Sequence, residues 1–312
     1  MVRLPSRILK RFRGFKEMKR MYRSPFGGTR AIAAAVVAVA DHRLDEDEHA
    51  WIGKIEALKD ELAFYTDMAI TFMDHGAGDP GDDVTTAEMA RGRSVTRALA
   101  EICQGGGIAY KWRLFLFRLV RLFKPSSCIE LGTSLGISAA FQAAALELNE
   151  KGCLSTLEGS EALAAIAQGN FRRLGLERVR VRIGRFQDTL DCVLGEHAPV
   201  DYVFVDGHHD EEATIGYYEQ MLPHLSNDAL LIFDDILWYE GMQRAWKRLT
   251  NYRHVRVAVD LGEVGVCIMS KEANPMLRER YTLPFVGWSI KGRLRRARGS
   301  WLRNAVVRSL WG

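Results

Sequence analysis

The sequence of 312 residues has few cysteines and no long apolar run. Its five cysteines are odd in number and form no CxxC pair, which argues against both a disulfide framework and a zinc cluster. The longest wholly apolar segment, residues 31–40, is too short to cross a bilayer, which takes about 20 residues. The basic stretch before it is too long for the charged leader of a signal peptide, and the cysteine content favours a reducing cytoplasm.

Acidic residues are nearly absent from the two ends of the chain. Residues 1–30 contain ten Lys/Arg and one Glu, and residues 288–312 contain seven Lys/Arg and no acid, so the rest holds 26 basic and 38 acidic residues. Because aromatic and aliphatic residues separate these cations, the ends could contact an anionic membrane at the inner face or dock on the acidic body. Nucleic acid is the least favoured of these partners, and a homodimer is left open.

Residues 1–107 are predicted to form an N-terminal helical region with a basic leader. Apolar residues recur every three or four positions over residues 51–65, which indicates an amphipathic helix, and a cluster of Gly, Pro and Asp at residues 75–83 indicates a loop. Further helices are expected at residues 86–102 and 110–123, the second ended by Pro125.

Residues 108–275 alternate short apolar runs with helical patterns, which predicts a mainly parallel sheet with crossover helices, while residues 276–312 form a basic C-terminal extension. The expected strands are residues 128–131, 154–158, 179–183, 201–205, 229–233, 255–259 and 265–270. The expected helices are residues 136–148, 161–174, 187–194, 211–225 and 241–249. The predicted fold class is α/β, a Rossmann-like sheet of seven strands that ends in an antiparallel hairpin.

A glycine-containing loop follows the first predicted strand. Within it, Gly132 would let the backbone approach a ligand closely, and Gly136 would begin a helix whose free N–H groups attract an anion. Glu158 ends the second strand, 22 residues past Gly136, where an acid commonly accepts hydrogen bonds from ribose hydroxyls. The loop taken alone could be an ordinary turn, and it departs from the Gly-x-Gly-x-x-Gly pattern of dinucleotide sites.

Five segments in order resemble class I S-adenosylmethionine methyltransferases, nearest the catechol and caffeoyl-CoA O-methyltransferase-like branch. They are ELGTSLGISAA, TLEGSEALAAIAQGNFRRLGL, GRFQD, DYVFVDGHH and LIFDDILW, within residues 116–269. The resemblance implies S-adenosylmethionine as the cofactor, with its methionine part at Gly132 and Ser138, its ribose at Glu158 and its adenine beside Phe186 and Gln187. The full set of predicted cofactor residues is Glu130, Gly132, Thr133, Ser134, Gly136, Ser138, Glu158, Gly184, Phe186, Gln187 and Asp206.

Acidic residues end the fourth and fifth predicted strands, at Asp206 and at Asp234-Asp235. Since neighbouring parallel strands lie about 5 Å apart, these carboxylates can converge, and hard oxygen ligands favour Mg²⁺ or another divalent cation. Metal-dependent O-methyltransferases, which the chain resembles, have an Asp at the first position and an Asp-Asn pair at the second. They also have a Lys where this chain has His209, whose imidazole, with a usual pKa of about 6.5, could accept the proton of a substrate hydroxyl. The alternative is that these residues cap turns and helices.

Together with the patterns, the resemblance implies methyl transfer to a hydroxyl of a small molecule, with Asp206 and His209 as catalytic residues and Asp206, Asp234 and Asp235 as metal ligands. Three rivals stay open: a nucleic-acid or membrane-associated methyltransferase without a metal, an NAD-dependent oxidoreductase, and a non-catalytic scaffold. The first is weakened because no Asn/Asp-Pro-Pro-aromatic segment or Pro-Cys nucleophile follows the fourth strand. Residues 51–123 are expected to form a lid that shapes the acceptor pocket, and the sequence does not name the methyl acceptor.

Overall fold

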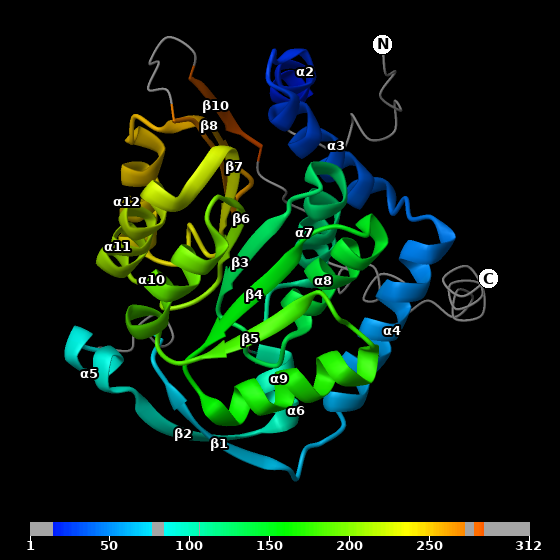
Figure 1. Cartoon of the computed structure of the whole chain (residues 1–312), viewed down its shortest axis with the longest axis vertical. Coiled ribbons are helices and arrows are strands. Elements are labelled where there is room, and N and C mark those ends of the chain that lie inside the picture. Colours follow the sequence, from blue (N-terminus) through cyan, green and yellow to red (C-terminus); the bar gives the residue numbers. More distant parts are fainter. Residues whose placement is uncertain (1–14, 77–83, 106, 272–277, 284–312) are drawn as a thin grey trace, which may run out of the picture.

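The computed structural model describes residues 15–76, 84–105, 107–271 and 278–283, and its centre is an eight-stranded sheet (Figure 1). The strand order is β10-β8-β9-β7-β6-β3-β4-β5, and β9 alone among these strands runs antiparallel to its neighbours. The strands are β3 (Ser127–Leu131), β4 (Cys153–Glu158), β5 (Val179–Ile183), β6 (Val200–Val205), β7 (Leu225–Phe233), β8 (Val255–Asp260), β9 (Gly265–Met269) and β10 (Glu279–Thr282). The predicted Rossmann-like, mainly parallel sheet, with its hairpin of β8 and β9, is confirmed.

Helices cover both faces of the sheet because successive strand residues point to opposite sides. On β6, for example, Phe204 packs in a core with α3, α7 and α8, whereas Val203 and Val205 pack in a second core with α10, α11 and α12. The two groups of helices lie on opposite sides of the sheet in Figure 1. These helices are α3 (Gly27–Asp41), α7 (Tyr110–Phe123), α8 (Ile137–Asn149), α10 (Phe186–His197), α11 (Glu211–Met221) and α12 (Glu240–Asn251).

Four more helices extend the first group. They are α2 (Phe15–Arg23), α4 (Glu46–Leu62), α6 (Leu99–Gly105) and α9 (Glu161–Leu174). The helix predicted at residues 51–65 is thus confirmed, but it begins five residues earlier, because Asp45 and Glu48 form a capping box at its start. The helix predicted at residues 211–225 ends at Met221 and continues as a 3-10 turn that contains Pro223, which has no N–H to donate.

The prediction of one helix over residues 86–102 is wrong. Only Thr86–Arg91 (α5) is helical before Gly92, whose φ of 76° ends the helix. Strand β2 (Arg93–Ala98) then pairs antiparallel with β1 (Ala69–Asp74), which the sequence did not predict. The cross-strand pairing, in which Thr71 and Thr96 also share a hydrogen bond of 2.8 Å, outweighs the helical spacing of the apolar residues. The N-terminal region is therefore not wholly helical.

Two further predictions concern the ends of the chain. In the part of the chain that the structure describes, no helix has both the length and the apolar character to cross a membrane. The proposed membrane-contacting tails lie largely outside the described residues, at 1–14 and 284–312.

The eighth strand, β10, pairs parallel with β8 at the edge of the sheet and was not predicted. The domain boundaries after residues 107 and 275 stay predictions.

Candidate active site

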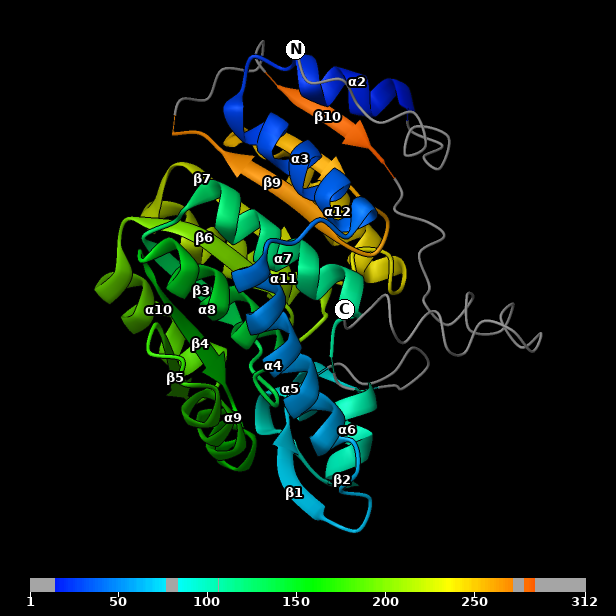
Figure 2. The same cartoon turned by 90° about the vertical axis from the view of Figure 1, so that its right-hand side faces the viewer.

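A cavity of about 740 Å³ opens at the carboxyl ends of β3, β4, β6 and β7. One side of it is formed by residues between 132 and 263 that follow these strands, and we call this the strand-end wall. The opposite side, the outer wall, is formed by cavity-lining residues between 59 and 113, from α4, β1, β2, α6 and the start of α7. Figure 2 shows these N-terminal elements beside the sheet. The cavity lies where parallel α/β sheets usually bind ligands.

The glycine loop after β3 lies directly against the end of β6. Gly132 has a φ of 104°, and a Cβ atom there would lie 2.0 Å from the carbonyl oxygen of Asp206. Gly136 has a φ of 80° and precedes α8, and its missing side chain leaves room for the ring of Phe171. Both positions therefore require glycine, one for the approach of two strand ends and one for the packing of the helix.

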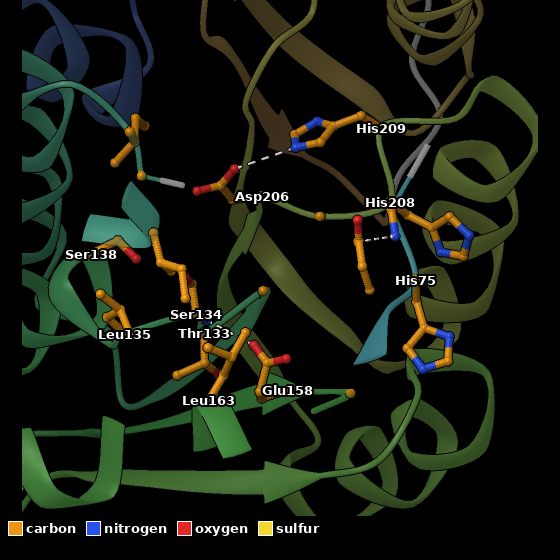
Figure 3. A pocket seen from close by; sticks show the side chains of 18 of the residues that line it. His75, Thr133, Ser134, Leu135, Ser138, Glu158, Leu163, Asp206, His208 and His209 are labelled. Carbon is orange, nitrogen blue, oxygen red and sulfur yellow. Dashed lines mark hydrogen bonds and ion pairs between the residues drawn. The ribbon is translucent and has the colours of Figure 1, made fainter. Parts of the chain in front are cut away.

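Glu158 is held by the loop that it faces (Figure 3). Its carboxylate accepts hydrogen bonds from the backbone N–H groups of Ser134, at 2.8 Å, and Ser160, at 2.9 Å. Burial raises the pKa of Glu158, while these backbone donors lower it. The carboxylate lines the cavity and keeps lone pairs that can accept from a diol, as the sequence predicted for the ribose.

Glu130 lies below the loop, fully buried, and is not among the residues that line the cavity. It accepts hydrogen bonds from the side chains of Ser138 at 2.8 Å, Gln142 at 2.7 Å and Thr156 at 2.6 Å. Burial raises the pKa of Glu130 to about 7, although these donors oppose the shift. Its place in the structure is that of a residue that orients Ser138, which does line the cavity.

The other predicted cofactor residues occupy two places. Thr133 lines the cavity near Ser134, and its hydroxyl lies 2.6 Å from the hydroxyl of Thr156. Phe186 and Gln187 also line the cavity, and the ring of Phe186 meets that of Tyr217 edge-on, with 5.7 Å between the ring centroids. Gly184 is not a lining residue, but its N–H donates to the backbone carbonyl of Glu158 at 2.8 Å and so ties the two strand ends together.

Three carboxyl groups and one imidazole meet at the ends of β6 and β7. His209 Nε2 lies 3.7 Å from Asp206 Oδ1, and His209 Nδ1 lies 3.9 Å from Asp235 Oδ2 (Figure 3 shows the first contact). Burial raises the pKa of Asp206 to about 6; Glu130 and Asp235 add to the shift, and His209 opposes it. Asp234 is buried, and burial and the charges of Asp206 and Asp235 raise its pKa well above the usual range. The imidazole thus lies between two desolvated acids.

The chemistry of this cluster suits a cation, but its number of ligands is small. Asp234 Oδ1 is buried without a hydrogen-bond partner among the described residues, and the clustered carboxyls repel one another, which a cation would relieve. Within residues 15–76, 84–105, 107–271 and 278–283, however, no three His, Cys, Asp or Glu side chains are arranged to hold a metal ion by themselves. Mg²⁺ is often held by one or two carboxylates plus water and substrate oxygens, so the predicted metal site stays a prediction.

The sequence predicted that residues 51–123 shape the acceptor pocket, but it identified no individual side chain of the outer wall. His75 follows β1 and packs on Gly159 beside Glu158; its Nδ1 lies 3.0 Å from the carbonyl oxygen of Met89. Trp112 also lines the cavity, and its indole N–H donates to Glu263 on the strand-end wall. No local pattern could identify these residues, because their role depends on how the N-terminal elements pack on the sheet.

His208, next to the predicted base, has a different environment. It is buried, its Nδ1 lies 2.7 Å from the hydroxyl of Tyr217, and burial lowers its pKa. Its hydrogen bond and burial indicate that His208 shapes the loop after β6, whereas His209 faces the acids.

Comparison with known proteins agrees with this geometry. Residues 129–236 match the family model described as a methyltransferase domain. A catechol O-methyltransferase of Niastella koreensis is 34% identical over 125 residues, which are 39% of this chain and 55% of that protein. The chain therefore spans about half the length of this relative. The predicted resemblance to catechol and caffeoyl-CoA O-methyltransferase-like proteins is confirmed.

The chain is also similar to solved structures of other proteins. An O-methyltransferase from Bacillus cereus in complex with SAH has 24% identity and a TM-score of 0.46, with 53% of this chain and 83% of that chain covered. A putative caffeoyl-CoA O-methyltransferase from Staphylococcus aureus has 17% identity and a TM-score of 0.48, with 55% and 88% covered.

Proposed function

We propose that this protein transfers a methyl group from S-adenosylmethionine to a hydroxyl group of a small molecule. The observation that carries the proposal is the position of Glu158. Its carboxylate is fixed by the glycine loop and faces the same cavity as Asp206 and His209, so a ribose-binding acid and a proton acceptor line one space.

The strand-end wall offers each part of the cofactor a suitable contact. Glu158 would accept hydrogen bonds from the ribose hydroxyls, and Phe186 and Gln187 would border the adenine. Gly132 and Ser138 would contact the methionine part. S-adenosylmethionine supplies a methyl group on a positively charged sulfur, and the acids of this wall favour that charge.

Catalysis then requires the removal of one proton. As the acceptor oxygen bonds to the methyl carbon, the carbon–sulfur bond breaks, its electron pair stays on sulfur, and the hydroxyl proton must leave. His209 is placed to accept that proton, and the carboxyls of Asp206 and Asp235 stabilise the resulting imidazolium from both sides. The cavity holds the acceptor in line with the carbon–sulfur bond, which contributes through orientation.

The proposal also includes a divalent cation. Asp206, Asp234 and Asp235 would hold it, and when bound it would lower the pKa of the acceptor hydroxyl. The unpartnered oxygen of Asp234 supports this assignment.

Cofactor-dependent stabilisation tests the proposal against its nearest rival. The melting temperature should rise with S-adenosylhomocysteine and should not change with NADH, since ligands stabilise the state that binds them. Stabilisation by NADH alone would replace the proposal with an oxidoreductase, and stabilisation by neither would favour a scaffold. A screen of hydroxylated acceptors, read by mass spectrometry as a methyl addition, then tests the transfer itself.

A further inference from the structure

The two walls of the cavity carry opposite charge. The strand-end wall presents five acids and one cation among the described residues that line it: Glu158, Asp206, Asp234, Asp235 and Glu263, with Arg185. The outer wall presents four cations and one acid: Lys59, Arg93, Arg97 and Arg113, with Asp74. A ligand that fills the cavity therefore meets negative charge on one side and positive charge on the other.

Two of the outer-wall cations are neutralised by the protein. Arg93 pairs with Asp74 at 3.2 Å, and the buried Arg113 pairs with Glu56 at 3.0 Å. By contrast, neither Lys59 nor Arg97 forms an ion pair or a side-chain hydrogen bond with a residue that the structure describes, although burial raises the pKa of the Glu56 carboxyl and the charge of Lys59 lies close enough to lower it. Their charges are left for water or for a ligand.

The proposed cofactor does not account for both charges. S-adenosylmethionine carries two positive groups, the sulfonium and the ammonium, which match the strand-end wall, and a single carboxylate. That carboxylate needs at most one of the free cations, and the helix N-terminus at Gly136 offers it another partner.

We propose that the methyl acceptor carries an anionic group, a carboxylate or a phosphate, which binds Lys59 and Arg97 on the outer wall. This inference rests on the proposed function and names the class of its substrate. Lys and Arg are the side chains that bind such groups most strongly, through charge-assisted hydrogen bonds. The acceptor would thus span the cavity, with its anion at the outer wall and its hydroxyl toward His209.

Matched probes test the proposal on the protein saturated with S-adenosylhomocysteine. The probes are 3,4-dihydroxybenzoate, its neutral amide 3,4-dihydroxybenzamide, and 3,4-dihydroxyphenylphosphonate, with Kd measured by calorimetry. At least one anion should bind about tenfold or more tightly than the amide, and the stronger of the two distinguishes a carboxylate site from a phosphate site. When S-adenosylmethionine replaces S-adenosylhomocysteine, the rates of methyl transfer to the three probes should follow the same order as their affinities.

Single substitutions test whether Lys59 and Arg97 bind the anionic group. Lys59→Gln and Arg97→Gln should each remove most of the anion preference, while binding of S-adenosylhomocysteine and of the amide stays near that of the unchanged protein. Lys54→Gln is the control, since Lys54 lies exposed on the same helix as Lys59 and does not line the cavity.

Three results would overturn the inference and leave the proposed function standing. They are equal binding of acid and amide, failure of both anions to bind at millimolar concentration, and loss of S-adenosylhomocysteine affinity in both variants, which would assign the cations to the cofactor. Failure of the unchanged protein to bind S-adenosylhomocysteine would instead refute the proposed function.

Discussion

The backbone of Gly132 lies so close to Asp206 that a Cβ atom on the glycine would be 2.0 Å from the carbonyl oxygen of the aspartate. This contact joins the glycine loop after β3 to the acid at the end of β6. The two ends of the proposed reaction, the methyl donor and the proton acceptor, are therefore positioned by one backbone contact.

Gly132→Ala should unfold or displace this junction. The new methyl group meets backbone, and φ of 104° strains any other residue, so we expect the free energy of unfolding to fall by about 3 kcal/mol and cofactor binding to be lost. Denaturant titration measures the first effect and calorimetry the second. Gly169→Ala on α9 is the control, because it meets no atom within 4 Å and should stabilise the protein by about 0.5–1 kcal/mol. Equal behaviour of the two variants would contradict the account.

His209→Gln should impair catalysis and spare binding. Without the imidazole between Asp206 and Asp235, kcat should fall by about 10²–10⁴-fold, while the Kd for S-adenosylhomocysteine stays within a small factor. His224→Gln, a histidine outside the cavity, should leave both values unchanged. If His209→Gln kept full activity with a good acceptor, another group would be the base.

Asp235→Ala tests the metal assignment. If the acid cluster holds a divalent cation, this change should abolish methyl transfer and the response of activity to Mg²⁺, because a ligand of the cation is lost. Cofactor affinity should survive, since Asp235 lies beside His209 after β7, and strands β6 and β3 separate β7 from β4, which ends at Glu158. Activity that persists in the unchanged protein after chelation would show that no metal is required. Equal loss of transfer and cofactor binding in the variant would remove Asp235 from the metal site.

The buried carboxyl group of Glu130 should make the stability of the protein depend on pH. Its pKa rises from an ordinary value of 4.5 to about 7 because it is buried, so the folded state retains a proton that the unfolded state loses. Stability should therefore fall as the pH rises from 4.5 to 7, and Glu130→Gln should remove about 3 kcal/mol of that fall. Denaturant titrations across this window measure it, with near-equal stability of both proteins expected at the acidic end. Parallel curves would contradict the buried, protonated state of Glu130.

The order of the strands and the positions of their ends could be predicted from the sequence. Each strand is a short apolar run followed by a polar residue, and this local pattern placed Glu158, Asp206 and Asp235 at one edge, where the structure has them. The loop glycines were recognisable for the same reason, since their positive φ values belong to the turn itself.

The strands and the individual lining residues of the outer wall could not be predicted, because they do not follow from local sequence patterns. β1 and β2 form only through pairing between residues about 25 positions apart, and Lys59 and Arg97 line the cavity only after α4 and β2 pack on the sheet. Burial also altered the interpretation of Glu130. An acid at the end of a strand suggested a cofactor contact, whereas its three side-chain donors enclose it below the loop.

The central claim is that Glu158 binds the cofactor, and calorimetric titration with S-adenosylhomocysteine tests it most directly. The unchanged protein should bind, and Glu158→Gln should weaken binding by at least about tenfold, because hydrogen bonds to a charged acceptor are lost. Glu161→Gln, the same change three residues later on α9 and outside the cavity, should bind as the unchanged protein does. Absence of binding, or equal affinity in the Glu158→Gln variant, would contradict the account.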